Sequence, residues 1–194
     1  MNIIIKYLLN MFPYAVISLP VAFLWRQIRK KTYLKKGIET TKEHEILSVL
    51  FVMYIVALLS QTVIPKIELN GDEIRFFQSG YNEINLTVFK EIKLAIKLGG
   101  SFFLVNIVGN IVVFMPIALF VGLLYNKPSF FKCVLITTAV SVFVEACQIP
   151  QNRGTDIDDV ILNTLGGIVG YVLFIIINKL FDQFSAKCKI VVRN

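Results

Sequence analysis

The sequence predicts an all-α polytopic membrane protein: a helical bundle of about five transmembrane helices with one extracytoplasmic amphipathic helix. Two observations predict this class. The chain has 194 residues, 56% of them hydrophobic, and a mean hydropathy of +0.69, whereas an ordinary soluble domain contains about 45–50% apolar residues. The apolar residues also form runs of the roughly 20 residues that one helix needs to cross a bilayer. We therefore expect a single membrane domain over residues 1–194.

The first predicted span covers about residues 3–25. This stretch is largely apolar and is followed by the basic run at residues 26–31. A cleaved signal peptide would begin with basic residues and have a shorter apolar run, so we expect this segment to be retained. Pro13 and Pro20 should kink the helix, which membrane helices tolerate when neighbouring groups satisfy the freed carbonyls.

Four further apolar runs are each long enough for one span. The last contains Gly166 and Gly170, a spacing that permits close contact between helices, and we expect it to pack inside the monomer. The four runs cover about residues 45–65, 101–125, 130–149 and 159–180.

The outer loop, residues 66–100, contains an amphipathic segment. Its apolar side chains recur at helical spacing, and its charged side chains fall mostly on the opposite face. We interpret the segment as a helix that lies flat at the membrane surface and walls a lipid-facing site. A linker helix packed on its neighbours is the alternative. The apolar positions are Val88, Phe89, Ile92, Ala95 and Ile96.

The distribution of lysine and arginine predicts the orientation. Of the 20 such residues, 13 lie after the first and third spans and in the C-terminal tail, and most of the others are balanced by nearby acids. Loops rich in lysine and arginine usually face the cytoplasm. With five spans, this rule places the N-terminus outside the cell membrane, the loop 66–100 outside and the C-terminus in the cytoplasm.

Polar residues at the outer ends of three spans are the main site signal. Polar groups within a span are costly and usually face the bundle interior or a water-filled cavity. Six of them form three pairs about one helical turn apart, so the members of each pair share a face, and the turn before the last span adds Arg153, Asp156 and Asp158. The expected topology brings them all to the outer leaflet. The candidate ligand-binding residues are Asn106, Asn110, Glu145, Gln148, Arg153, Asp156, Asp158, Asp159 and Asn163.

Three interpretations of this cluster are open. It can be a hydrogen-bonded packing cluster that only joins the helices. It can hold a divalent cation, the only cofactor we consider, through the carboxylates of Glu145, Asp156 and Asp159. It can also be a pocket for an amphiphile, in which Arg153 pairs with a phosphate or carboxylate head group. If that pocket is catalytic, the same three carboxyl groups are its general acids or bases.

Other classes of function have little support. The pI is near 9.3, but the basic residues cluster beside apolar runs, so we expect no nucleic-acid partner. Cys133 and Cys147 would stand about 21 Å apart on one helix, too far for a disulfide. No zinc-ligand spacing and no serine–histidine–aspartate set occurs in the sequence. The sequence does not indicate an oligomeric state.

The motifs, taken together, resemble the VanZ-like family of membrane proteins. They follow one another over about residues 85–175 in the family's order. The family often has Asn-Leu-x-Pro-Phe before the third span, and this chain has Asn85-Leu-Thr-Val-Phe89, with Val88 at the proline position. The matching motifs are NIVGN at 106–110, FMP at 114–116, EACQ at 145–148, Arg153, DIDDVILNTLGG at 156–167 and Gly170.

The resemblance implies a Gram-positive cell-envelope protein associated with resistance to glycopeptide antibiotics, to teicoplanin more than to vancomycin. Teicoplanin carries an acyl chain, so an outer-leaflet pocket would suit a lipidated glycopeptide or a membrane lipid of the envelope. We expect a non-enzymatic binding factor. The alternative is an intramembrane enzyme that modifies a lipid-linked envelope component with Glu145 or Asp159 as acid or base.

Overall fold

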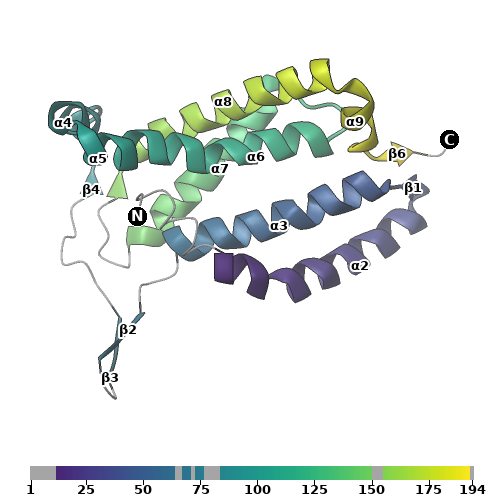
Figure 1. Ribbon diagram of the computed structural model, residues 1–194, viewed down its shortest axis with the longest axis horizontal. Coiled ribbons are helices and arrows are strands. Elements are labelled where there is room, and N and C mark those ends of the chain that lie inside the picture. The colour runs from purple at the N-terminus through teal and green to yellow at the C-terminus, as the bar shows by residue number, and fades with distance from the viewer. Residues whose placement is uncertain (1–11, 64–66, 71–72, 77–83, 150–154, 193–194) are drawn as a thin grey trace.

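The computed structural model contains a bundle of long apolar helices that run side by side (Figure 1). Four helices of the described chain are long and apolar enough to cross a membrane, which confirms the all-α membrane class. They are α3 (Lys42–Thr62), the continuous stretch Gly100–Leu124, α7 (Phe130–Gln148) and α8 (Ile157–Leu180). The structure describes residues 12–63, 67–70, 73–76, 84–149 and 155–192.

The fifth predicted span, about residues 3–25, is not among these four helices. Residues 1–11 lie outside the described residues. The helix α2 (Leu19–Lys35) continues through the basic run, and the bounds of the first span stay a prediction. Pro20 stands in the first turn of α2, where proline is tolerated because the first amides of a helix have no partner within it.

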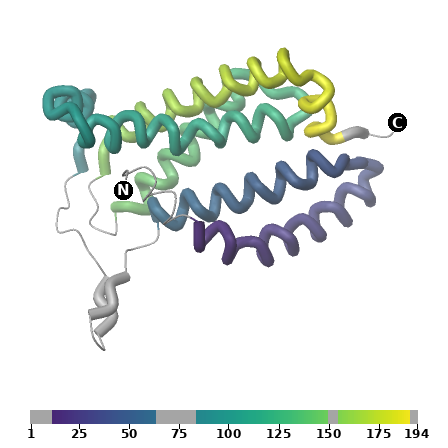
Figure 2. The backbone as a smooth tube through the Cα atoms, in the orientation of Figure 1, coloured from purple at the N-terminus to yellow at the C-terminus, as the bar shows by residue number. Residues whose placement is uncertain are grey.

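The basic run stays helical because its arginines pair with the neighbouring helix. α2 and α3 form a hairpin whose two arms lie side by side (Figure 2). Arg26 Nε and Arg29 Nη2 donate to the two carboxylate oxygens of Glu45 on α3, at 2.8 and 3.1 Å. Arginine and lysine also favour helices intrinsically. The helix therefore extends past residue 25, where the predicted span ends.

α8 packs closely along the stretch Gly100–Leu124, as the glycine spacing predicts. This stretch consists of α5 (Gly100–Phe103), the π-helix η1 (Leu104–Gly109) and α6 (Asn110–Leu124). A Cβ atom added at Gly166 or Gly170 would overlap the backbone of that stretch at Ile111 or Met115. Only glycine therefore permits this approach, which fixes the start of α8 beside η1.

Three short strand pairs, which the sequence did not predict, connect distant segments. β2 (Ile67–Asn70) and β3 (Glu73–Phe76) form an antiparallel hairpin, and β1 (Ile38–Glu39) pairs antiparallel with β6 (Val191–Val192). β4 (Ile84–Asn85) pairs in parallel with β5 (Thr155–Asp156). This last pair holds the part of the 66–100 loop that precedes α4 against the start of α8.

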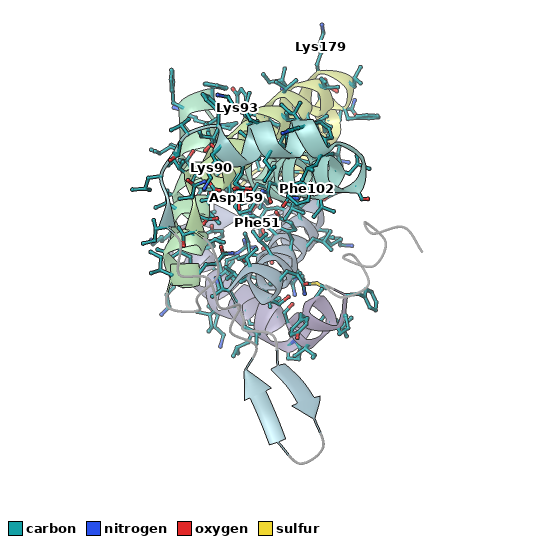
Figure 3. The ribbon with its side chains drawn as sticks, turned by 90° about the vertical axis from the view of Figure 1, so that its left-hand side faces the viewer. Phe51, Lys90, Lys93, Phe102, Asp159 and Lys179 are labelled. Carbon is teal, nitrogen blue, oxygen red and sulfur yellow. The ribbon has the colours of Figure 1, made fainter. Side chains whose placement is uncertain are left out.

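The amphipathic segment of that loop is helical, as predicted, and it forms α4 (Lys90–Leu98). α4 lies across one end of the bundle, transverse to the long helices (Figures 1 and 3). Its inner face packs on the bundle through Ile92 and Ala95, which contact a cluster with Ile107 and Leu162. The opposite end of the bundle carries the short helix α9 (Asp182–Lys187).

Candidate functional site

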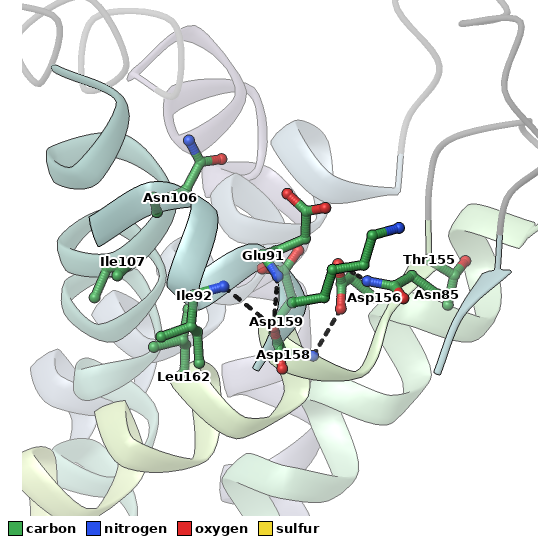
Figure 4. Close-up of a pocket in the computed structure, with 12 residues that line it drawn as sticks. Asn85, Glu91, Ile92, Asn106, Ile107, Thr155, Asp156, Asp158, Asp159 and Leu162 are labelled. Atoms are coloured by element: carbon green, nitrogen blue, oxygen red, sulfur yellow. Dashed lines mark hydrogen bonds between the residues drawn. The ribbon is translucent and has the colours of Figure 1, made fainter. Parts of the chain in front are cut away.

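A pocket of about 300 Å³ lies at the α4 end of the bundle. Its walls come from α4, from η1, from the β4–β5 pair and from the first turns of α8 (Figure 4). Two distant parts of the sequence, residues 85–107 and 155–162, therefore meet around one cavity. The lining residues are Asn85, Lys90, Glu91, Ile92, Ala95, Asn106, Ile107, Thr155, Asp156, Asp158, Asp159 and Leu162.

Asp158 fastens α4 to the start of α8. Its carboxylate is fully buried and accepts hydrogen bonds from the backbone N–H groups of Phe89 (2.5 Å), Glu91 (2.9 Å) and Ile92 (3.2 Å). The first N–H groups of a helix have no acceptor within it, and the N-cap residue of α4, Phe89, has no side-chain acceptor. A carboxylate from another helix therefore caps α4, in a place where the helix dipole also favours negative charge.

Asp156 organises the turn that leads into α8. Its Oδ1 accepts from the N–H of Asp158 at 2.9 Å and so caps α8, while its Oδ2 accepts from Asn85 Nδ2, also at 2.9 Å. The backbone N–H of Asp156 donates to Glu145 Oε2 at 3.2 Å. Glu145 is buried and is not one of the pocket-lining residues. It acts on the site by holding this turn in place.

Asp159 and Asn110 link α8 to the η1–α6 stretch beside the pocket. Asn110 Nδ2 donates to Asp159 Oδ1 at 2.6 Å and also contacts the carbonyl of Asn106 at 3.1 Å. Asp159 lines the pocket directly. Asn106 also lines it and belongs to the π-helix η1, a helix type that is rare and frequent at functional sites.

The sequence-predicted site residues thus separate into groups. Asn106, Asp156, Asp158 and Asp159 line the pocket, and Asn110 and Glu145 support it. Asn163 is buried and donates to Ser141 Oγ at 2.9 Å, and Gln148 donates to the carbonyl of Thr62 at 3.0 Å. These two join helices away from the cavity. Arg153 lies outside the described residues.

Four further residues line the pocket that the sequence did not predict as site residues: Asn85, Lys90, Glu91 and Thr155. Asn85 is the first residue of the motif before α4, and Lys90 and Glu91 belong to the amphipathic helix. Because this segment was expected to form a wall of the site, its polar residues could have been predicted to line the pocket. Thr155 gave no such signal, because only its pairing in β5 with Ile84 brings it to the wall.

The pocket combines an acidic polar wall with an apolar wall. Of the described lining residues, four carry carboxylates and one, Lys90, carries an ammonium group. The carboxylates of Asp156 and Asp158 are used by the hydrogen bonds that fix the backbone, which leaves Glu91 and Asp159 to face the cavity. The other wall consists of the apolar residues Ile92, Ala95, Ile107 and Leu162. Such a lining suits a ligand with a donor-rich polar part and an apolar part.

A metal site is a separate question. The residues that the structure describes contain no group of three or more histidine, cysteine, aspartate or glutamate side chains that could hold a metal ion.

The comparisons with known proteins give one match. The sequence model of the VanZ/LLP1 family matches residues 46–178. That range contains every residue that lines the pocket. No curated protein and no solved structure matches the chain at a significant level.

Proposed function

Since the chain belongs to the VanZ/LLP1 family, we propose that it is a cell-envelope membrane protein linked to glycopeptide resistance and that it acts by binding an amphiphile in the pocket beside α4. The family and the four apolar helices make it a membrane protein. The proposed ligand is a lipidated glycopeptide, such as teicoplanin, or an envelope lipid. The observation that carries the proposal is the pocket itself, in which carboxylates and amides face an apolar wall.

The proposed orientation puts this pocket on the outer side of the membrane. Lys127 and Lys132 flank the turn between α6 and α7, at the end of the bundle opposite α4. Lys179 stands in the last turn of α8, also away from the pocket. The excess of lysine at that end favours the cytoplasm, so the α4 end would face the compartment in which glycopeptides act.

The chemistry of binding follows from the two walls. Asp159 and Glu91 would accept hydrogen bonds from hydroxyl, amide or amine groups of the head, and Asn106 would both donate and accept. An acyl chain would lie along Ile92, Ile107 and Leu162, where burial contributes about 0.8 kcal/mol for each CH₂ group. Both kinds of glycopeptide can make the polar contacts, so the acyl-chain contribution is the one that favours an amphiphile.

A binding titration on the full chain in lipid nanodiscs tests this proposal. We expect teicoplanin to bind and its deacylated form to bind at least about tenfold more weakly, a loss of about 1.4 kcal/mol. Leu162→Ala should weaken teicoplanin and leave the deacylated form little changed. Gln148→Ala, which lies away from the pocket, is the matched control. Equal binding of the two ligands, or no effect of Leu162→Ala, would contradict the proposal.

The enzyme alternative depends on one observation, a pocket-lining carboxylate with a fixed position. Asp159 is held at one oxygen by Asn110 and faces the cavity, which is the placement a general acid or base requires. Asp159→Asn keeps hydrogen-bonding capacity but removes proton transfer. If the protein is an enzyme, cells with this variant should lose resistance completely. The mass change that the unchanged enzyme makes on a lipid-linked envelope component should also disappear. A binding factor should keep part of its resistance and show no such mass change in either form.

A further inference from the structure

The outer face of α4 carries a row of three lysines. Lys90, Lys93 and Lys97 stand three and then four residues apart, so they share one face of the helix. Ile92 and Ala95, on the opposite face, pack on the bundle. Lys90 also lines the pocket. Lys93 and Lys97 are exposed and lie outside the pocket lining.

Large apolar side chains flank this lysine row. Leu94 is 40% exposed, Ile96 60% and Leu98 59%. Leu94 and Leu98 are one turn apart on one flank of α4, and Ile96 lies on the other flank. Apolar side chains exposed on both sides of a charged row are typical of a helix in the interface between lipid chains and headgroups.

The direction of α4 agrees with such a position. It lies transverse to the long helices at the end of the bundle, as Figures 1 and 3 show from two directions. Because the long helices cross the membrane, a transverse helix at their ends lies in the plane of the membrane surface. In that plane the flanking leucines can reach the acyl chains while the lysines stay among the headgroups.

We propose that the face of α4 formed by Lys93 and Lys97, with its flanks Leu94 and Leu98, docks on anionic phospholipid headgroups. The charge of the face selects this occupant, because lysines near an anionic surface gain an electrostatic attraction that a zwitterionic surface does not provide. The contact holds α4 at the surface from outside while Asp158 holds it from inside. The proposal concerns the outer face of α4 and does not depend on what fills the pocket.

Quenching by brominated lipids tests the proposal on the full chain in nanodiscs. Leu98→Trp places an indole on the flank of α4, and the unchanged chain measures the contribution of its single natural tryptophan, Trp25. At equal total bromolipid, we expect brominated phosphatidylglycerol to quench the new indole more strongly than brominated phosphatidylcholine. Lys93→Gln/Lys97→Gln should remove that preference. Lys127→Gln/Lys132→Gln, at the other end of the bundle, should keep it.

A second measurement uses the chain without an added tryptophan. Backbone amides of α4 should exchange hydrogen more slowly in nanodiscs that contain phosphatidylglycerol than in pure phosphatidylcholine, and the double lysine variant should lose this difference. Equal quenching by the two lipids, or a preference that survives in Lys93→Gln/Lys97→Gln, would overturn the proposal. The teicoplanin titration is a separate readout, so failure of one proposal does not imply failure of the other.

Discussion

Asp158 shows how one side chain connects the loop, the pocket and the bundle. Its buried carboxylate accepts three backbone hydrogen bonds at the start of α4, and its own N–H is bound by Asp156. From the sequence it is one of several candidate ligand-binding acids. In the structure its oxygens are occupied by the protein backbone, so we assign it the role of positioning the pocket wall.

Asp158→Ala should therefore release α4 from the bundle. A buried N–H group that loses its acceptor costs about 1–3 kcal/mol, and we expect α4 to lose about 2–4 kcal/mol of docking free energy in total. Hydrogen exchange should become faster at the amides of Lys90–Leu98 and stay unchanged in α6 and α8. Glu91→Ala, a change in the same pocket wall that removes no acceptor from these amides, is the control. Unchanged exchange in α4 would contradict the assigned role.

Among the helices, the contact between α6 and α8 places the pocket acids beside η1. Gly170→Ala would drive its new Cβ into the backbone carbonyl of Met115, and such overpacking costs about 1–3 kcal/mol or more. Gly109→Ala is a matched control on the adjacent stretch, because its Cβ would stand 3.5 Å from the nearest atom, the carbonyl oxygen of Leu104. Thermal unfolding should show a lower midpoint for Gly170→Ala only. Equal midpoints for the two variants would mean that the close approach is not required.

The contact between α2 and α3 should depend on Glu45. Its carboxylate is buried and receives both Arg26 and Arg29. Removing Glu45 takes the anionic partner from both arginines, while Arg29 keeps its hydrogen bond to Ser48 Oγ at 2.6 Å, so we expect a cost of about 1–3 kcal/mol. Glu45→Ala should therefore make α2 sensitive to limited proteolysis. Arg26→Ala should have a smaller effect, because Arg26 is the more exposed arginine and Arg29 still pairs with Glu45. Resistance of α2 in Glu45→Ala would show that apolar contacts alone hold it.

The same elements show what the sequence could and could not predict. The four long apolar helices follow from hydropathy alone, because a span of this length has few other structures in a membrane. The amphipathic pattern predicted α4, and the spacing of Gly166 and Gly170 predicted the close packing of α8. The continuation of α2 through the basic run could not be predicted, because the pairing of Arg26 and Arg29 with Glu45 is a tertiary contact. The pairing of β4 with β5 joins dipeptides about 70 residues apart, so no local sequence pattern predicts it.

For the whole molecule, the orientation in the membrane decides which compartment the pocket faces. The lysine distribution predicts that Thr87, before α4, lies outside and that Lys127, between α6 and α7, lies inside. A cysteine at Thr87 should react with a membrane-impermeant reagent on intact cells, and a cysteine at Lys127 should react only after permeabilisation. The unchanged chain controls for Cys133, Cys147 and Cys188. The reverse pattern would put the pocket in the cytoplasm.

The most direct test of the central claim is a cryo-electron microscopy map of the full chain in nanodiscs with teicoplanin. We predict density for the polar head beside Asp159 and Asn106 and for the acyl chain along Ile92, Ile107 and Leu162. A map with the antibiotic bound elsewhere, or with an empty pocket at saturating antibiotic and no lipid in its place, would contradict the claim that this pocket is the amphiphile-binding site.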